Sequence, residues 1–399
     1  MKNSFGQNII FTIFGESHGE MVGCVIDGLP AGISVEDENI KALLFKRRPV
    51  SNLETARKEP DEYKIVSGVF NGFTTGSPVC ILIPNVNQKS DDYDKNIIRP
   101  SHADYTGYVK YDGFNDYRGG GHFSGRVTAG IVAAGGILIP VLKNMGIRIV
   151  SHIGECAGIK DDDFDFGDFD LCNFDFGDFG DLHHGKFIKL CEKIDASLFP
   201  VINKEAGERM KQEIKNAAET GDSVGGIIKT AVLGVPAGIG EPFFDSVESL
   251  ISHALFSIGG VKGVEFGAGF MGTKLTGSEF NDEFAVKNQK IITLTNNNGG
   301  INGGISNGMP ILFDTAVKPT PSIFKKQQTV NLAAGTVETL EIKGRHDPAI
   351  IRRICPVIDS LTALVICDLL VSEFGKRVLL PEKGSTNTGN TNTGKVIKL

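Results

Sequence analysis

An internal repeat is the feature of this sequence that most constrains its fold. The segment Gly28-Leu-Pro-Ala-Gly-Ile33 recurs as Gly234-Val-Pro-Ala-Gly-Ile239, in each case between a short apolar run and a helical pattern. Further along, Gly72-Phe-Thr-Thr-Gly-Ser-Pro-Val79 has a counterpart in Gly304-Ile-Ser-Asn-Gly-Met-Pro-Ile311, and each leads into an apolar strand. Two paired matches in the same order indicate that a strand–helix–strand unit is duplicated.

The chain of 399 residues is long enough for two ordinary domains or one large duplicated domain. We expect a single domain over residues 1–383, in which the duplicated units span about 20–85 and 226–320. Hydrophobic periodicity places helices after the repeated motifs, at Val35 to Phe45 and Val247 to Ser257. Further helices are predicted at 127–143, 203–218 and 348–375.

Two segments fall outside that pattern. Residues 161–181 are acidic and of low complexity, with Phe164-Asp-Phe-Gly-Asp-Phe169 repeated ten residues later. The spacing of the aspartates does not fit a calcium-binding loop, so we interpret the stretch as a surface insertion. Residues 384–399 are rich in Gly, Thr and Asn and are expected to form a disordered tail.

The formal net charge of −7 gives no reason to expect nucleic acid or an anionic membrane as a partner. The local charge differs, because residues 41–58 carry six basic side chains and one acidic side chain. A basic segment in an acidic protein favours a small anionic ligand, although a solvated helix face would have the same composition.

The sequence also predicts the cellular compartment. Seven scattered cysteines without a C-x-x-C pair indicate free thiols in a reducing environment. The N-terminus lacks the apolar region of a signal peptide, and no apolar run is expected to be long enough to cross a bilayer. We therefore expect a cytoplasmic protein.

Residues Arg99 to Arg126 carry the strongest chemical signal. They contain the histidines His102 and His122, three arginines and the run Gly119-Gly-Gly121. Imidazole transfers protons near neutral pH, and guanidinium groups bind carboxylate or phosphate. Consecutive glycines let backbone N–H groups approach a ligand closely. The segment therefore predicts proton chemistry on an anionic substrate, beside a bound cofactor.

Three other motifs each have a functional and a structural interpretation. His18 could face a cleft or be a plain loop histidine. Asp347 fits either a proton carrier or the N-cap of a helix that begins at Pro348. Lys318-Pro-Thr-Pro-Ser322 fits a phosphate site or an ordinary proline turn.

No metal site is expected. His102-x-Asp104 and His183-His184 lack a third ligand at a suitable spacing. Gly267-Ala-Gly-Phe-Met-Gly272 has the spacing of a dinucleotide-binding motif, but no helical pattern follows it, so we reject that interpretation too.

Five motifs, in order along the chain, carry a resemblance to a known family. They are Phe14-Gly-Glu-Ser-His-Gly19, Lys46-Arg-Arg-Pro49, Arg99-Pro-Ser-His-Ala-Asp-Tyr-Thr106, Asp116-Tyr-Arg-Gly-Gly-Gly121 and Gly344-Arg-His-Asp-Pro348. Together they resemble the chorismate synthase family, and the match runs from about residue 6 to residue 375. Only the insertion and the tail fall outside it.

The resemblance implies a lyase that converts 5-enolpyruvylshikimate 3-phosphate to chorismate and phosphate by 1,4-elimination. This is the last common step of aromatic amino acid biosynthesis in the shikimate pathway. The resemblance also implies reduced FMN (FMNH2) as cofactor, although the reaction has no net redox change. It implies an α+β fold, a β-α-β sandwich with helices between two antiparallel sheets, which the duplication fits, and a homotetramer.

The resemblance assigns roles residue by residue. It implies that His18 protonates the departing phosphate, that His102 stabilises the reduced flavin at its pyrimidine edge, and that Asp347 helps to move the substrate proton near flavin N5. Positions that match substrate or NADP contacts are Ser17, Arg47, Arg48 and Arg126. Positions that match flavin contacts are His122, Phe123, Ser124, Gly259, Gly260, Gly303, Lys318, Pro319, Thr320, Pro321, Ser322 and Arg345.

The sequence departs from the family pattern at a few positions. His122 and Phe123 replace a common arginine and serine, so we expect backbone or stacking contacts from them. Val50 replaces a glycine, and Leu53 replaces a basic residue often assigned to nicotinamide nucleotide contact. Two sources of reduced flavin therefore stay open, namely NADPH used by this chain and a separate flavin reductase.

Three rival functions also stay open. The first is a conventional FMN-dependent oxidoreductase acting on a phosphorylated or carboxylated small molecule. The others are a metal-dependent hydrolase and an interaction protein that binds partners through the Phe/Asp repeat.

Overall fold

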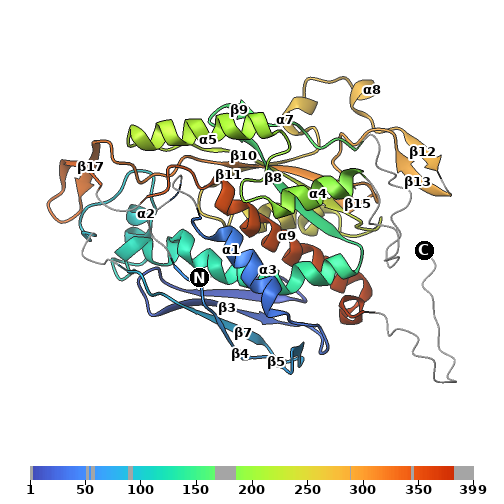
Figure 1. Ribbon diagram of the computed structural model, residues 1–399, viewed down its shortest axis with the longest axis horizontal. Coiled ribbons are helices and arrows are strands. Elements are labelled where there is room, and N and C mark those ends of the chain that lie inside the picture. The colour runs from blue at the N-terminus through green and yellow to red at the C-terminus, as the bar shows by residue number, and fades with distance from the viewer. Residues whose placement is uncertain are drawn as a thin grey trace.

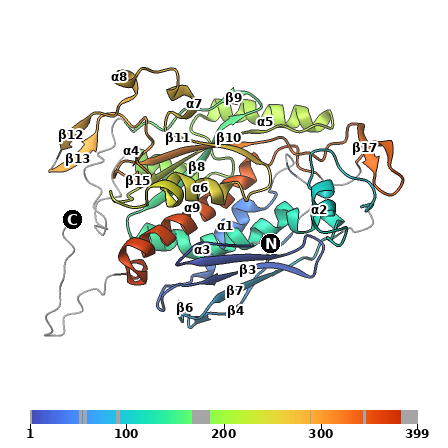
Figure 2. The same ribbon diagram turned by 180° about the vertical axis from the view of Figure 1, so that it is seen from behind.

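The computed structural model describes most of the chain, and Figures 1 and 2 show it from opposite sides. The described residues are 3–50, 54, 59–88, 93–166, 186–287, 289–342 and 346–381. The expectations for Leu53, Arg345, residues 167–181 of the insertion and the tail 384–399 lie outside the described residues.

Two five-stranded antiparallel sheets form the outer frame of the fold. The first has the order β1-β2-β3-β7-β4, with bounds Ser4–Phe5, Ile10–Gly15, Met21–Asp27, Val79–Pro84 and Lys64–Ser67. The second has the order β11-β16-β10-β8-β9, with bounds Val261–Phe266, Ile311–Val317, Gly226–Leu233, Arg148–Cys156 and Ile159–Lys160.

Helices fill the space between the two sheets (Figure 1). This layer consists of α1 (Asp37–Arg47), α3 (Thr128–Asn144), α6 (Val247–Leu255) and α9 (Ile351–Phe374). Both views place α5 (Lys204–Glu219) on the far side of the second sheet, and α4 (Lys186–Ala196) packs on Val150 and Leu233 there. The expected α+β sandwich, with helices between two antiparallel sheets, is confirmed.

Short elements complete the described chain. The hairpins are β5 (Val69–Phe70) with β6 (Phe73–Thr74), β12 (Phe284–Lys287) with β13 (Lys290–Thr293), β14 (Ile301–Asn302) with β15 (Ile305–Ser306), and β17 (Gln327–Asn331) with β18 (Thr336–Leu340). The short helices are α2 (Asp104–Lys110), α7 (Gly269–Gly272), α8 (Gly277–Phe280), η2 (Arg118–Phe123), η3 (Gly125–Val127), η5 (Phe243–Asp245) and η6 (Lys376–Leu379).

The repeated sequence motifs form the same pair of side-chain hydrogen bonds in both sheets. Thr74 donates its hydroxyl to the carbonyl of Pro30 (2.6 Å) and accepts the N–H of Ile33 (2.9 Å). Ser306 does the same in the second sheet, to the carbonyl of Pro236 (2.6 Å) and from the N–H of Ile239 (2.9 Å). One buried hydroxyl therefore satisfies two backbone groups in each turn that leaves a central strand.

The predicted helices occur where periodicity places them, except that α1 and α9 begin two and three residues later than predicted. Helix α1 begins at Asp37 rather than at Val35, because the N–H of Val35 donates to the carbonyl of Gly72 (2.8 Å). That hydrogen bond holds Val35 in the turn before the helix. Apolar periodicity alone therefore places the start of α1 two residues too early.

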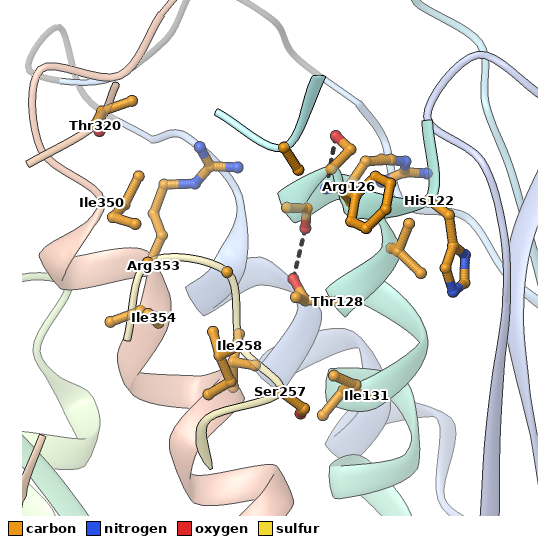
Figure 3. Close-up of a pocket in the computed structure, with 18 of the residues that line it drawn as sticks. His122, Arg126, Thr128, Ile131, Ser257, Ile258, Thr320, Ile350, Arg353 and Ile354 are labelled. Atoms are coloured by element: carbon orange, nitrogen blue, oxygen red, sulfur yellow. Dashed lines mark hydrogen bonds between the residues drawn. The ribbon is translucent and has the colours of Figure 1, made fainter. Parts of the chain in front are cut away.

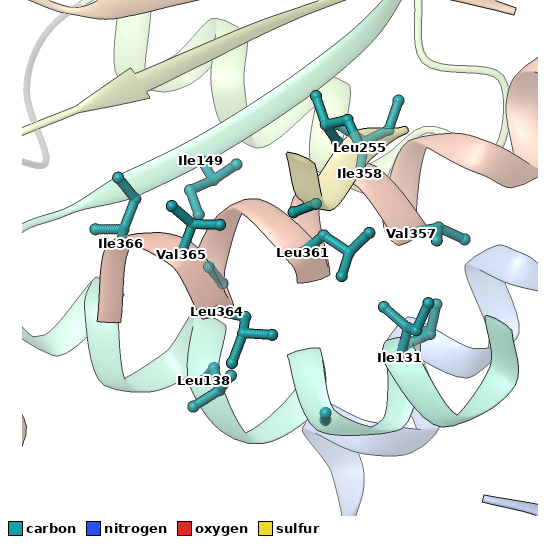
Figure 4. Close-up of a cluster of buried hydrophobic side chains, with 14 of the residues drawn as sticks. Ile131, Leu138, Ile149, Leu255, Val357, Ile358, Leu361, Leu364, Val365 and Ile366 are labelled. Atoms are coloured by element: carbon teal, nitrogen blue, oxygen red, sulfur yellow. The ribbon is translucent and has the colours of Figure 1, made fainter. Parts of the chain in front are cut away.

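Glycines that weaken α3 by propensity allow its neighbours to approach closely. A Cβ atom on Gly135 would lie 2.1 Å from Ser360 Oγ of α9, and one on Gly136 would lie 2.6 Å from Ile40 Cα of α1. Figure 4 shows the apolar contact that results, with Leu138 of α3 facing Leu364 of α9. Burial of this interface offsets the helix-propensity cost of about 1 kcal/mol per glycine.

Two helices in the described part of the chain, Gly125–Asn144 and Ile351–Phe374, are long and apolar enough to span a bilayer by length and composition. The expectation that no apolar run reaches that length is therefore wrong. Their most apolar windows are 78% and 94% buried inside the protein, as in core helices.

The first residues of the acidic insertion are docked on the outer face of the second sheet. The Asp161 carboxylate accepts hydrogen bonds from His152 Nδ1 (2.9 Å) and the N–H of Ile202 (2.6 Å). The ring of Phe164 lies edge-on to His152 and contacts Phe187 of α4, at centroid distances of 4.6 and 5.8 Å. The apolar side chains of this segment are thus anchored rather than solvated.

Candidate active site

A cavity of about 870 Å³ opens where α3 and α9 begin. Figure 3 shows Arg353 and Ile354 of α9 on one wall, and Arg126, Thr128 and Ile131 around the start of α3 on the other. The apolar part of the lining comes from α3, α6, α9 and the first sheet, and includes Ile131, Ala254, Ile354, Phe11 and Ile13. The size and the mixed lining are typical of a small-molecule site, for which volumes are roughly 300–1,000 Å³.

Most residues assigned from the sequence meet at this cavity. Those that line it are His102, Asp347, Arg47, Arg126, His122, Phe123, Ser124, Gly259, Gly260, Lys318, Pro319, Thr320, Pro321 and Ser322. Four described residues do not line it, namely Ser17, His18, Arg48 and Gly303. Gly303 lies in the turn between β14 and β15 with φ +63°.

Two consecutive glycines of the run each lie next to a histidine. Gly119 and Gly120 have positive φ, and a Cβ atom on Gly119 would lie 2.6 Å from Cδ2 and Nε2 of His18. A Cβ atom on Gly120 would lie 2.9 Å from Cε1 of His102. No side chain fits at either position, so the run is needed for the packing of the imidazoles and not only for a ligand's approach.

His18 lies behind the cavity wall. Its side chain is buried, and the ring of Tyr93, which lines the cavity, meets it edge-on at 5.3 Å between centroids. Gly119 also lines the cavity, so His18 lies directly behind two lining residues, Gly119 and Tyr93.

An aspartate and an arginine orient His102. Asp104 Oδ1 lies 2.7 Å from His102 Nδ1, and Arg99 donates to both carboxylate oxygens of Asp104 from Nε and Nη2, each at 2.7 Å. Burial would raise the pKa of Asp104, but the hydrogen bonds from Arg99 and His102 outweigh it and hold that pKa well below its usual range. The ionised carboxylate accepts the Nδ1 proton, which leaves Nε2 of the ring next to Gly120.

Three arginines converge on the buried carboxylate of Asp61. Arg126 and Arg47 pair with Asp61 Oδ1 and Oδ2 respectively, the latter at 3.3 Å, and Arg48 Nε lies 3.7 Å from Oδ2. Burial opposes ionisation of Asp61, yet the charges of Arg47, Arg126 and Arg48 outweigh it and lower the pKa. Arg47 and Arg126 are therefore held in place by Asp61, and the three guanidiniums around this single carboxylate keep a net positive charge.

Asp347 is not the N-cap of α9. The helix begins at Ile351, its N-cap is Ile350, and Asp347 instead pairs with Arg353 Nη1 at 2.5 Å. The structural alternative predicted from Pro348 is therefore wrong. Arg353 also donates from Nε to the carbonyl of Arg47 (2.8 Å), so it ties Asp347 to the end of α1.

The Lys318 to Ser322 loop follows β16 along the cavity. The N–H of Lys318 donates to the carbonyl of Gly260 (2.9 Å), and its ammonium donates to the carbonyl of Ser101 (2.7 Å). The Thr320 Oγ1 atom is buried without a hydrogen-bond partner among the described residues, and Ser322 is buried. The loop thus presents one ammonium and a buried hydroxyl beside the cavity.

His122 and Phe123 use their side chains against the protein. His122 Nδ1 donates to the carbonyl of Gly15 (2.7 Å). The Phe123 ring packs against Gly107, since a Cβ atom on that glycine would lie only 2.8 Å from the ring. The Ser124 hydroxyl accepts the N–H of Arg126 (3.3 Å) and caps η3.

Sequence reasoning missed several residues that shape the cavity. Sequence analysis gave no role to Asp61, Arg353 or Lys262. Arg353 lies in no motif, and Lys262 lies in a strand without a local signal. The basic count of residues 41–58 is the signal that calls for a buried carboxylate such as Asp61. Nothing in the local sequence marks Arg353, because its partners are distant along the chain.

A cavity with paired guanidiniums and an oriented imidazole, set in a β-α-β sandwich, defines an enzyme that performs acid–base chemistry on a small anionic molecule. The family model described as chorismate synthase matches residues 9–371. The chain therefore belongs to the chorismate synthase family, whose reaction class is a lyase step of aromatic amino acid biosynthesis that forms chorismate.

Comparisons with individual relatives support the assignment to this family. The chain is 44% identical over 372 residues to the chorismate synthase of Dehalococcoides mccartyi, covering 92% of this chain and 96% of the relative. It is 42% identical over 374 residues to that of Thermococcus gammatolerans, covering 92% and 97%. A crystal structure of a chorismate synthase superposes with a TM-score of 0.71 at 26% identity, covering 93% of this chain and 94% of the other.

Proposed function

We propose that this enzyme eliminates phosphate from 5-enolpyruvylshikimate 3-phosphate in a 1,4 sense to give chorismate, with reduced FMN bound in the cavity. The observation that carries the proposal is the pair of imidazoles, His18 and His102, packed on consecutive glycines of one cavity wall. An elimination that expels a phosphate needs a proton donor at the leaving group and an acceptor for the substrate proton.

The chain's residues fit FMN. The Thr320 Oγ1 atom is buried without a hydrogen-bond partner in the described part of the chain, and the Lys318 ammonium lies in the same loop, which suits a phosphate group. The apolar side chains of α3, α6 and α9 suit a flat aromatic ring. When bound, reduced FMN supplies electron density that amino-acid side chains cannot supply.

The protein groups hold and move protons around that ring. His102 presents Nε2 toward Gly120, where it can hydrogen-bond a flavin edge, while Asp104 retains the proton on Nδ1. His18 protonates the departing phosphate past the backbone of Gly119, which puts no side chain in the way. Asp347 accepts the substrate proton once its contact with Arg353 loosens.

Anionic groups of the substrate would be held by arginines. Arg47 and Arg126 reach the cavity from the Asp61 cluster, and Arg48 and Ser17 act just behind its wall. We include Arg345, His122, Phe123, Ser124 and Gly303 as flavin contacts, with His122 and Phe123 acting through backbone or packing. The Nδ1 contact of His122 with Gly15 supports that limited role.

The test is an anaerobic assay with photoreduced FMN. Chorismate should appear without stoichiometric oxidation of the flavin, because the elimination is redox neutral. Stoichiometric flavin oxidation would instead support a conventional FMN-dependent oxidoreductase. Repeating the assay with NADPH in place of photoreduction decides whether the chain reduces its own flavin or depends on a separate reductase.

We also propose a cytoplasmic homotetramer. Apolar side chains are exposed on the β12–β13 hairpin and on α7, where Phe284, Val286, Ile291 and Phe270 are each at least 70% exposed. An exposed apolar patch of this kind is typical of a subunit interface. Sedimentation equilibrium should give four times the chain mass, and Ile291→Lys should lower it.

A further inference from the structure

Tyr93 lines the cavity, and none of the sequence motifs contains it. Its ring meets the buried ring of His18 at an interplanar angle of 88°, with 5.3 Å between the centroids. The guanidinium carbon of Arg99 lies over the same ring, 5.4 Å from its centroid. One aromatic ring therefore contacts both a buried histidine and the arginine that holds Asp104.

The contacts of Tyr93 continue as far as the second histidine. Arg99 donates from Nε and Nη2 to the two carboxylate oxygens of Asp104, each at 2.7 Å, and Asp104 Oδ1 lies 2.7 Å from His102 Nδ1. The side chains of Arg99 and Asp104 are only 11% and 13% exposed, so solvent ions screen this ion pair little. Tyr93 therefore links His18 to His102 by a route that does not pass through the glycine run.

The segment that follows Tyr93 is fixed to the β17–β18 hairpin. Ile97 forms an isolated β-bridge with Asn331, and the N–H of Leu332 donates to the carbonyl of Asn96 (2.8 Å). The backbone is thus anchored within three residues of Tyr93, which favours a fixed position for its ring.

Both contacts of Tyr93 depend on its aromatic ring. The electron-rich face of an aromatic ring attracts a cation, and two aromatic rings attract each other when they are perpendicular. The Tyr93 hydroxyl takes part in neither contact and makes no hydrogen bond within the described part of the chain. Phenylalanine at this position would therefore keep both contacts, and leucine would remove both.

We propose that Tyr93 is a positioning residue, whose ring holds His18 directly, and His102 through Arg99, in the geometry that proton transfer requires. The catalytic importance of the two histidines rests on the proposed function. The positioning itself rests only on the contacts of the Tyr93 ring, so it can be measured without turnover.

The first test follows the histidines by nitrogen-15 NMR in wild type, Tyr93→Leu and Tyr93→Phe, with His18→Asn and His102→Asn used for assignment. The imidazole signals of His18 and His102 should both move in Tyr93→Leu and stay in place in Tyr93→Phe. The His152 signal should not move in either variant, because His152 pairs with Asp161 on the outer face of the second sheet. It therefore reports whether the variant is folded.

The NMR comparison can overturn the proposal in two ways. Unchanged signals of both histidines in folded Tyr93→Leu would show that the ring positions neither of them. Movement of the His18 signal alone would overturn the link to His102 through Arg99. If Tyr93→Leu does not fold, Tyr93→Met gives the same comparison, since it also fills the space without a ring.

Turnover with photoreduced FMN is the second test. Tyr93→Leu should lower kcat by roughly 10- to 100-fold, because a small displacement of a reacting group can cost about 10²-fold. Tyr93→Phe should recover most of that loss, and a Tyr93→Phe enzyme as slow as Tyr93→Leu would overturn the role of the ring. Tyr108→Leu is the matched control, because Tyr108 is exposed and does not line the cavity. If the wild type forms no chorismate, the proposed reaction fails, while the NMR comparison still decides the positioning role.

Discussion

Asp104 Oδ1 lies 2.7 Å from His102 Nδ1, and this contact fixes which ring nitrogen carries the proton. Asp104→Asn should lower turnover by about 10- to 100-fold, as loss of a carboxylate that orients a histidine typically does, because His102 would no longer present an unprotonated Nε2 to the flavin. The amide can donate to Nδ1, so the ring should shift toward the Nε2–H tautomer. Nitrogen-15 NMR of the labelled histidine reports the tautomer without turnover. A mutant ring that stays Nδ1-protonated would remove Asp104 from a positioning role.

The glycine run can be tested by adding a single methyl group. In Gly119→Ala, the new Cβ atom would meet His18 at 2.6 Å and sit at φ +60°. We expect an activity loss of roughly 10²–10⁴-fold, similar to that of His18→Ala, since either change removes the proton donor from its place. Gly277→Ala is the control, because nothing lies within 4 Å of its Cβ position and it does not line the cavity. Steady-state kinetics on the three variants decides whether position 119 acts through His18.

Asp61 should make the protein sensitive to acid. Its pKa is lowered by Arg47, Arg126 and Arg48, so its contribution to stability is present above the unfolded value of 3.8 and is lost as pH falls through the folded value. Asp61→Asn leaves buried guanidiniums uncompensated and should cost about 3–5 kcal/mol near pH 7. The difference in unfolding free energy between wild type and Asp61→Asn should shrink below about pH 4. Urea denaturation at several pH values measures this difference in unfolding free energy. A difference that does not change with pH would contradict the lowered pKa of Asp61.

The equivalent buried hydroxyls of Thr74 and Ser306 predict similar losses of stability on mutation. Thr74→Val and Ser306→Ala each leave a buried N–H and a carbonyl without their partner, at a cost of about 1–3 kcal/mol. Thr75→Val serves as the control, because Thr75 is exposed and adjoins Thr74. Chemical denaturation of the three variants provides the comparison. Equal stability of Thr74→Val and Thr75→Val would show that the buried hydroxyl is dispensable.

The sequence predicts the elements of this fold better than it predicts the charge pairing of the site. Periodicity locates α6 and α9 because the apolar face of a helix repeats locally along the chain. The pairing of Arg353 with Asp347, and its contact with the carbonyl of Arg47, depend on residues up to 306 positions apart. Local capping rules therefore give the wrong role for Asp347, because its carboxylate pairs with Arg353 instead of capping the helix.

Resemblance to a family identifies the histidines and the Lys318 loop in the sequence. The residues that contact them are known only from the structure. That Gly119 and Gly120 abut His18 and His102 follows from how three separate segments meet. That Lys262 joins Lys318 in the cavity lining follows from the pairing of β11 with β16, which no short motif encodes.

Helix α9 has a consequence for how the protein is made. Its first turns supply Arg353, Ile354 and Val357 to the cavity, and Arg352 and Arg353 bind the carbonyls of Lys46, Arg47 and Arg48 at the end of α1. During synthesis, α1 leaves the ribosome well before α9. The carbonyls at the basic end of α1 therefore meet their permanent donors only after the 306 positions that separate Arg47 from Arg353 have been made. A nascent chain that is cut short ahead of α9 would hold every histidine of the proposed chemistry and still lack a wall to enclose a ligand.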